Sequence, residues 1–234
     1  MGRAGGAPWF ARLFDVKDSG SGPILAMDAS SARPTVALLG PADEAWGHWV
    51  QEAGLRGTRE LAVRASELLQ ARDLAVEDLG GVAVGIGPGS YTGLRAAIAF
   101  AVGLTQPSKL PLAGVASVEA AAWGILRTDP AVEAVTVLLD ARRDECYRAD
   151  YRRKGAWFEE TGAPRLVPSS EADVLGDSTA SQIIVREPDP DGYDVGALGR
   201  RRLMAGGDAP AAVLPLYLKR SHAEIALEER TRRR

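Results

Sequence analysis

Short apolar runs, separated by small polar turns, follow one another through the first half of the chain and predict a mixed α/β unit. Runs at residues 24–27, 35–39 and 45–50 are typical of three consecutive strands in a meander. Apolar residues at helical spacing then predict a helix over residues 58–72, with Thr58 as its N-cap. The elements expected after it are a buried strand at 81–86, a helix at 92–104, a strand at 112–115 and a helix at 117–126.

The order of elements then begins again. The apolar run 135–139 ends in Asp140, just as the first run ends in Asp28, 112 residues earlier. Two more strands are expected at 146–151 and 156–160, so the order strand, aspartate, turn, strand, turn, strand occurs twice. This repeat matches the duplicated actin-like (ASKHA, ribonuclease H-like) α/β fold, in which two halves face each other across a cleft.

The second half is abbreviated. After Glu171 the pattern predicts only one short helix, a strand at 183–185, a helix at about 195–205 and a final apolar stretch at 213–218. The segments we expect are a mobile N-terminal extension at 1–22, a first actin-like subdomain at 23–105, a second at 106–220 whose last helix or strand can pack back on the first, and a charged tail at 221–234.

Composition limits the binding partners and the cellular compartment that we expect for this protein. A formal net charge of −3 gives no overall electrostatic reason to bind nucleic acid or an anionic membrane. The single cysteine, Cys146, is typical of a reducing compartment, and its acidic neighbours favour a strand residue over a nucleophile. The N-terminal residues lack the apolar core of a signal peptide, and no apolar run is long enough to span a bilayer. We therefore expect a cytoplasmic protein.

The densest signal is the segment Gly-Ile-Gly-Pro-Gly-Ser-Tyr-Thr-Gly-Leu-Arg at residues 85–95. Its glycines and proline end a buried strand and start a helix, with Ser90 or Thr92 available as N-cap. Such a turn exposes backbone N–H groups that could hold an anion. It fits neither the Walker P-loop nor the Rossmann pattern.

The helix that follows has no polar face, because residues 96–104 read Ala-Ala-Ile-Ala-Phe-Ala-Val-Gly-Leu. A helix that is apolar on all sides must be covered on all sides. Small residues such as Ala97, Ala101 and Gly103 would let a second helix approach closely. Either the neighbouring helix and the second half cover it, or another protein does.

These motifs resemble the bacterial TsaB (YeaZ) family. The resemblance rests on the glycine-rich segment, on Ile-Leu-Ala-Met-Asp-Ala-Ser before it, on Gly-Val-Ala-Ser-Val-Glu-Ala at 114–120 and on Asp-Ala-Arg-Arg at 140–143. The ending Pro-Leu-Tyr-Leu-Lys-Arg at 215–220 is similar to the closing element of that family. Two departures are Thr58-Arg59-Glu60, where members carry His-Ser-Glu, and a shorter stretch at about 177–182.

The resemblance implies a non-catalytic subunit that binds and activates TsaD, the transferase that makes threonylcarbamoyladenosine (t6A) in ANN-decoding tRNAs. It also implies a TsaE-type ATPase as a further partner and contact with tRNA only through the complex. Self-association in isolation is expected because an exposed apolar face seeks cover, and no membrane partner is expected. No cofactor is expected on this chain, whereas ATP, magnesium and a catalytic metal are expected on the partner subunits. The predicted partner interface consists of Leu61, Ala65, Leu68, Tyr91, Thr92, Leu94, Arg95, Ile98, Ala101 and Val102.

Catalysis by the chain itself is not expected. The transferase carries a His-x-x-x-His metal pair, and the matching positions here are Ser117 and Ala121, which supply no imidazole. The two histidines, His48 and His222, are interpreted as structural or surface residues.

Two alternatives stay open. In an autonomous ATP-binding ATPase or kinase, Asp28 and Asp140 would face each other across the cleft and hold magnesium or water. No glycine follows either aspartate, so bonding to turn amides is the simpler role for both. The residues that could contact a nucleotide or anion are Asp28, Ser30, Gly89, Ser90 and Asp140. The other alternative is a self-associating structural protein that uses the same apolar helices.

Overall fold

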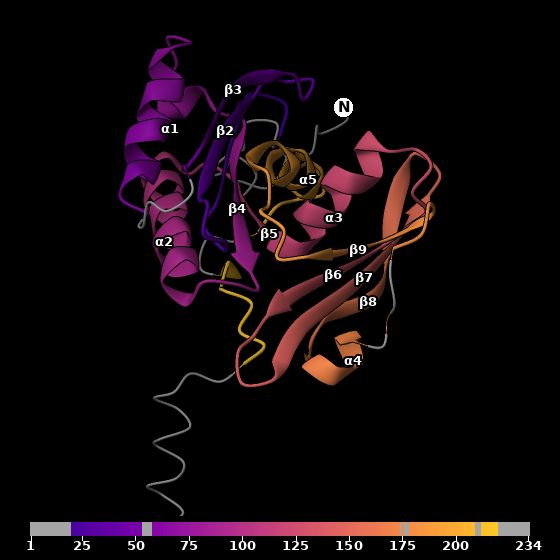
Figure 1. Cartoon of the computed structure of the whole chain (residues 1–234). Coiled ribbons are helices and arrows are strands. Elements are labelled where there is room, and N and C mark those ends of the chain that lie inside the picture. The colour runs from indigo at the N-terminus through magenta and orange to yellow at the C-terminus, as the bar shows by residue number, and fades with distance from the viewer. Residues whose placement is uncertain (1–19, 53–57, 174, 176–177, 209–211, 220–234) are drawn as a thin grey trace, which may run out of the picture.

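The computed structural model describes residues 20–52, 58–173, 175, 178–208 and 212–219, and these form two β-sheets with helices packed on them (Figure 1). The first sheet has five strands in the order β3-β2-β1-β4-β5. They are β1 (Ile24–Asp28), β2 (Thr35–Leu39), β3 (Ala45–Val50), β4 (Gly81–Gly87) and β5 (Leu112–Ala116). The meander β1–β3 is antiparallel, whereas β4 and β5 continue the sheet parallel to β1.

Both faces of the first sheet are covered, which explains why its central strands are apolar throughout. In β1, Leu25 and Met27 join one hydrophobic core, whereas Ile24 and Ala26 join the other. Helices α1 (Glu60–Gln70) and α2 (Tyr91–Ser108) cover the first of these faces, beside the short 3₁₀ turn η2 (Val76–Asp78). The opposite face packs against α3 (Ser117–Thr128) and α5 (Gly192–Met204).

The second sheet repeats the order of the first and lacks its last strand. Its order is β8-β7-β6-β9, with β6–β8 antiparallel and β9 parallel to β6. The elements of this half are β6 (Ala134–Asp140), β7 (Glu145–Lys154), β8 (Trp157–Pro168), α4 (Ser169–Asp173) and β9 (Gln182–Arg186). The predicted duplicated actin-like fold with an abbreviated second half is therefore confirmed.

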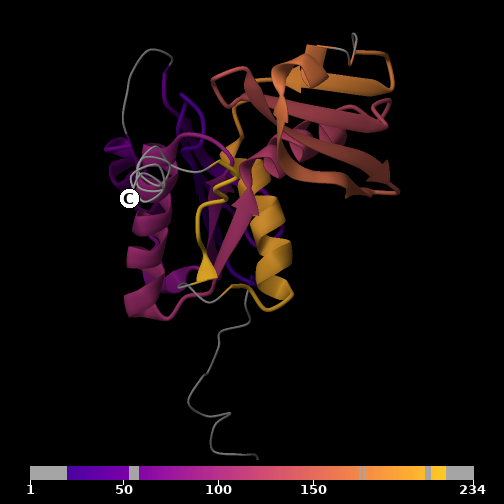
Figure 2. The same ribbon diagram turned by 90° about the horizontal axis from the view of Figure 1, so that it is seen from below.

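One hydrophobic core joins the two halves, because residues of α3 and α5 pack with residues of both sheets. The second sheet consequently lies on the opposite side of the first sheet from α2 (Figure 2). The outward side of α2 therefore points away from the second half.

Several predicted boundaries differ from the structure. The first sheet continues past residue 105 to include β5. Helix α5, from the end of the chain, packs back on this sheet, as the prediction allowed. Helix α1 begins at Glu60 without a side-chain cap, so the prediction of Thr58 as N-cap was wrong; its carbonyl accepts a bond from the Leu61 N–H instead. The stretch 213–218 forms no strand. The extension up to residue 19 and the tail from residue 220 lie outside the described residues.

One expectation about an individual residue was met. Cys146 is a buried strand residue in the core between β7 and α4. Among the described helices, none combines the length and apolar character needed to cross a membrane.

Candidate functional site

The glycine-rich turn between β4 and α2 packs directly on the turn that follows β1. Ser90 is the N-cap of α2, because its hydroxyl accepts a bond from the Gly93 N–H at 3.2 Å. The Ser90 N–H donates to the Ser30 carbonyl at 2.6 Å. A Cβ added at Gly89 would overlap Ser30, and one added at Gly93 would overlap the Ala29 carbonyl. The glycines therefore allow two backbone turns to touch.

Asp28 lies beneath this contact and is 1% exposed. One carboxylate oxygen accepts bonds from the N–H and hydroxyl of Ser30, at 2.7 and 2.6 Å. The other accepts the Ser117 hydroxyl at 2.5 Å, and that hydroxyl in turn accepts the Gly87 N–H at 3.0 Å. A Cβ at Gly85 would overlap the same carboxylate. Asp28 thus ties together the ends of β1 and β4 and the start of α3.

Burial raises the pKa of Asp28 above its ordinary value, and the hydrogen bonds from Ser117 and Ser30 oppose that rise. Asp140, at the equivalent end of β6, is exposed and accepts the Arg142 N–H at 2.7 Å. Each aspartate therefore bonds to the amide two residues further on, as expected for a turn-stabilising role.

Helix α2 has one buried side and one exposed side. Its buried residues are Gly93, Leu94, Ala97, Ile98, Ala101 and Thr105. Its exposed residues include Thr92, Arg95, Ala99, Gly103 and Gln106, at helical spacing, with Ala96 and Val102 half-buried between them. A Cβ added at Gly103 would meet no atom within 4 Å. The small outward residues are thus Ala96, Ala99 and Gly103, whereas the predicted Ala97 and Ala101 point into the core.

This exposed side, which we call the α2 face, is defined by Thr92, Arg95, Ala96, Ala99, Val102, Gly103 and Gln106. Within the described residues α2 packs mainly on β1, β4, β5 and η2, all of which lie on its other side. From Ala96 to Gln106, about three turns of the helix, this side carries no charged residue and is left open to solvent.

The structure divides the predicted interface residues into two groups. Five are buried in the chain's own core: Leu61, Ala65, Leu94, Ile98 and Ala101. The other five are exposed or half-buried: Leu68, Tyr91, Thr92, Arg95 and Val102. The prediction selected apolar residues without regard to which side of each helix faces the sheet. On α1 the same omission missed Val63, which is 54% exposed.

Two predicted interface residues, Tyr91 and Arg95, belong to an aromatic cluster at the start of α2 whose third member, Tyr217, was not predicted. Tyr91 is 47% exposed, and the Arg95 guanidinium lies 4.9 Å from the centre of its ring. Tyr217, from the end of the described chain, stacks on Tyr91 with 5.1 Å between ring centres and is also 47% exposed. The only sequence signal for Tyr217 was the closing Pro-Leu-Tyr-Leu motif. Because Tyr217 lies far from Tyr91 in the sequence, the contact between them could not be predicted.

The positions considered for metal chemistry have other roles. Ser117 is committed to Asp28, and Ala121 is buried. His48 lies on β3 beside Thr35 at 3.0 Å and packs on Tyr193. Across the described ranges, no group of three or more potential ligand residues could hold a metal ion. His222 lies outside the described residues.

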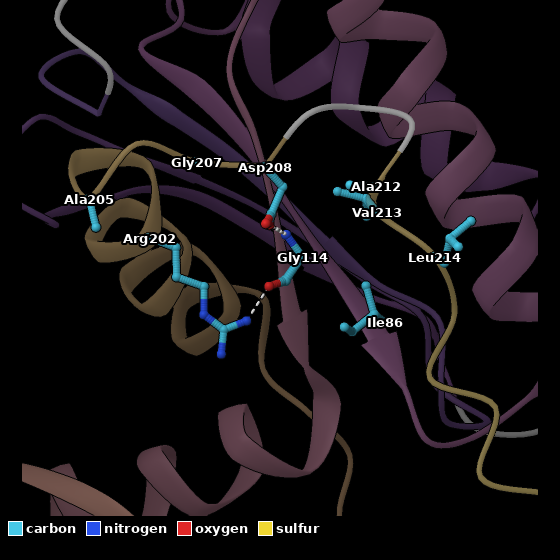
Figure 3. A pocket seen from close by; sticks show the side chains of 9 residues that line it. All are labelled: Ile86, Gly114, Arg202, Ala205, Gly207, Asp208, Ala212, Val213 and Leu214. Atoms are coloured by element: carbon cyan, nitrogen blue, oxygen red, sulfur yellow. Dashed lines mark hydrogen bonds between the residues drawn. The ribbon is translucent and has the colours of Figure 1, made fainter.

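A cavity of about 410 Å³ opens between the end of α5, β5 and the segment after residue 211 (Figure 3). Its charged side chains bond to the strand, since Arg202 donates to the Gly114 carbonyl and Asp208 accepts the Gly114 N–H at 3.0 Å. Gly206 and Gly207 end α5 in a Schellman arrangement, with the Gly207 N–H bonded to the Arg202 carbonyl at 2.8 Å. This glycine pair therefore caps the C-terminus of α5.

Two ribonuclease H-like sheets joined through α3 and α5 define the chain as an actin-like protein. The family model described as TsaD, tRNA N6-adenosine threonylcarbamoyltransferase, matches residues 56–182. The tRNA threonylcarbamoyladenosine biosynthesis protein TsaB of Escherichia coli is 33% identical over 160 residues, which cover 66% of this chain and 68% of that protein. TsaB of Haemophilus influenzae is 31% identical over 169 residues, covering 68% of this chain and 70% of that protein.

The solved structure of YeaZ from Pseudomonas aeruginosa has the same fold, with a TM-score of 0.72 and 24% identity over 84% of this chain and all of that one. The chain belongs to the TsaB family, also called YeaZ.

Proposed function

We propose that this chain is a non-catalytic subunit in the biosynthesis of tRNA threonylcarbamoyladenosine, which binds and activates a TsaD-type threonylcarbamoyl transferase. The relatives that carry the TsaB name support the pathway. The observation that carries the binding role is the α2 face, an exposed helix surface of small and apolar residues.

The chemistry of the α2 face suits a second helix. Ala96, Ala99 and Gly103 lie on successive turns, and their small side chains let another helix approach closely. Val102 and the exposed Val63 of α1 would add apolar area that loses water on association. Apolar surface left exposed in this way is typical of an interaction site.

The transferase is the preferred partner because it is related to this chain. The transferase family model spans residues 56–182 and therefore covers both α1 and α2. A transferase subunit would carry counterparts of both helices, so two related chains could pair through equivalent surfaces. Two copies of this chain could pair in the same way, which accounts for the expected self-association in isolation.

In this proposal the reaction takes place on the partners. ATP, magnesium and the catalytic metal belong to the transferase and to a TsaE-type ATPase, and tRNA is reached through the complex. Both oxygens of the Asp28 carboxylate already accept hydrogen bonds from Ser30 and Ser117, which supports a structural role over a nucleotide-binding one.

The test is co-expression with the transferase of the same organism, followed by size-exclusion chromatography and a tRNA modification assay. The informative variant is Gly103→Glu, because the position is open and glutamate favours a helix more than glycine does. We expect this variant to fold, to lose the complex and to lose stimulation of tRNA modification.

The matched control is Met204→Glu, which places the same charge at a position 69% exposed on α5, on the other side of the first sheet. It should form the complex like the natural chain. Co-elution of the Gly103→Glu variant with the transferase would refute the assignment of the α2 face. ATP turnover by the isolated chain at the rate of the complex would refute the accessory role.

A further inference from the structure

Residues 213–219, here called the closing segment, run from the first sheet to the second half of the protein (Figure 1). At one end Val213 is buried in the core beneath α2 and the Leu216 N–H donates to the Ile86 carbonyl at 2.7 Å. At the other end the Lys219 ammonium donates to the Ala141 carbonyl at 2.8 Å and pairs with Glu145 at 2.6 Å. The segment is thus fixed at both ends by groups other than the Tyr217 ring.

Between these anchors the closing segment presents Tyr217 to solvent beside Tyr91 and Arg95. In the described chain five large hydrophobic side chains are exposed, and two of them, Tyr91 and Tyr217, stack on each other. Tyrosine and arginine are, with tryptophan, the residue types enriched where protein interfaces concentrate their binding energy. Stacking also limits the freedom of both rings before any partner arrives, which lowers the entropy lost on binding.

We propose that Tyr217 is a contact residue for the transferase subunit, so that the partner surface extends from the α2 face onto the closing segment. The inference rests on the proposed function. Continuity identifies the occupant: Arg95 belongs both to the α2 face and to the tyrosine cluster, and Thr92 of the α2 face directly follows Tyr91. A partner helix lying along Ala96 and Gly103 would reach the cluster at the start of α2.

A protein fits this cluster better than RNA does. The Arg95 guanidinium already lies over a ring, and the Lys219 charge is paired with Glu145. On the turn to which Lys219 binds, exposed Asp140 and Asp144 balance the charges of exposed Arg142 and Arg143. A single-strand binding groove would need an uncompensated positive track along the backbone path.

The test uses isothermal titration of the full chain with the purified transferase subunit. Tyr217→Ala should weaken binding by at least about tenfold, whereas Tyr217→Phe, which keeps the ring, should stay within about threefold of the natural chain. The matched control is Leu214→Ala, at a position of the same segment that is 67% exposed, and it should also stay within about threefold. Hydrogen exchange of the natural chain should show protection of residues 213–219 when the transferase is added.

The outcomes separate this inference from the proposed function. If Gly103→Glu abolishes binding while Tyr217→Ala binds normally and residues 213–219 gain no protection, the α2 face stands and the role of Tyr217 is wrong. If the natural chain does not bind the transferase, the proposed function itself fails. Binding of an anticodon stem-loop by the chain alone, lost in Tyr217→Ala, would overturn the inference in favour of an RNA contact.

Discussion

Replacing Ser117 with alanine removes the hydroxyl that joins β1, β4 and α3. In the native protein Ser117 is 1% exposed. Its hydroxyl donates to the Asp28 carboxylate at 2.5 Å and accepts a bond from the Gly87 N–H at 3.0 Å. A hydrogen bond to a charged group contributes about 1.5–3 kcal/mol, and a buried N–H left without a partner costs about 1–3 kcal/mol. Because one hydroxyl serves both bonds, we expect Ser117→Ala to lower the free energy of unfolding by about 2–4 kcal/mol at neutral pH.

The loss should depend on pH in a defined direction. The folded-state pKa of Asp28 lies above its ordinary value of 3.8, so protonation of this carboxyl stabilises the fold. That stabilisation is complete below pH 3.8 and is lost as the pH rises through the folded-state pKa. The Ser117 hydroxyl opposes the rise, so its removal raises the pKa of Asp28 further. The difference between the two proteins should therefore be largest at neutral pH and shrink as the solution is acidified.

Urea unfolding, followed by tryptophan fluorescence at about pH 7.5 and about pH 5, measures both effects. The matched control is Ser31→Ala, which removes an exposed hydroxyl bonded to the Arg33 N–H on the neighbouring turn; it should change stability by less than about 0.5 kcal/mol at either pH. A loss below about 1 kcal/mol for Ser117→Ala, or a loss that grows on acidification, would show that Asp28 is not held as described.

Four further substitutions test the packing of individual residues. Gly85→Ala should abolish soluble expression or lower the free energy of unfolding by more than about 3 kcal/mol, because the added Cβ would overlap Asp28. Gly103→Ala, in open space on α2, should raise the free energy of unfolding by up to about 1 kcal/mol in the same urea assay. Arg200→Met should lower it by about 2–4 kcal/mol, because this 5% exposed guanidinium binds Asp43 at 2.6 Å and three backbone carbonyls; retention of full stability would contradict this. Tyr151→Phe should leave the thermal midpoint unchanged or raise it, because the buried hydroxyl has no hydrogen-bond partner among the described residues; a marked drop would reveal one.

Sequence patterns predicted the fold because two strong local signals agreed. Apolar runs that end in aspartate recur at Asp28 and Asp140, and the glycine-rich turn marks the passage from strand to helix. Both signals arise from backbone requirements within a few residues, so the sequence displays them directly. The predicted N-cap Ser90 and the turn bonds of both aspartates were confirmed for this reason.

The features that the sequence did not predict depend on contacts between residues that are distant in sequence. Strand β8 continues to Pro168, although its residues Thr161, Gly162 and Pro164 are typical of a turn. It tolerates them because it lies at the edge of the sheet and its pairing with β7 shifts register near Asp150. Composition alone could not show which side of α2 faces the sheet, because apolar residues lie all round that helix.

The buried network around Asp28 and the exposed α2 face are two consequences of one arrangement. Asp28 fixes the Ser30 turn, and the Ser30 carbonyl holds the Ser90 N–H at the start of α2. Close contact between Gly93 and Ala29 then sets how deeply the first turn of the helix lies on the sheet. Glycines and a carboxylate that could serve a ligand in another actin-like protein are here used to orient a helix. The chemistry available to a partner is therefore found on the outer side of α2, where the same packing leaves Ala99 and Gly103 exposed.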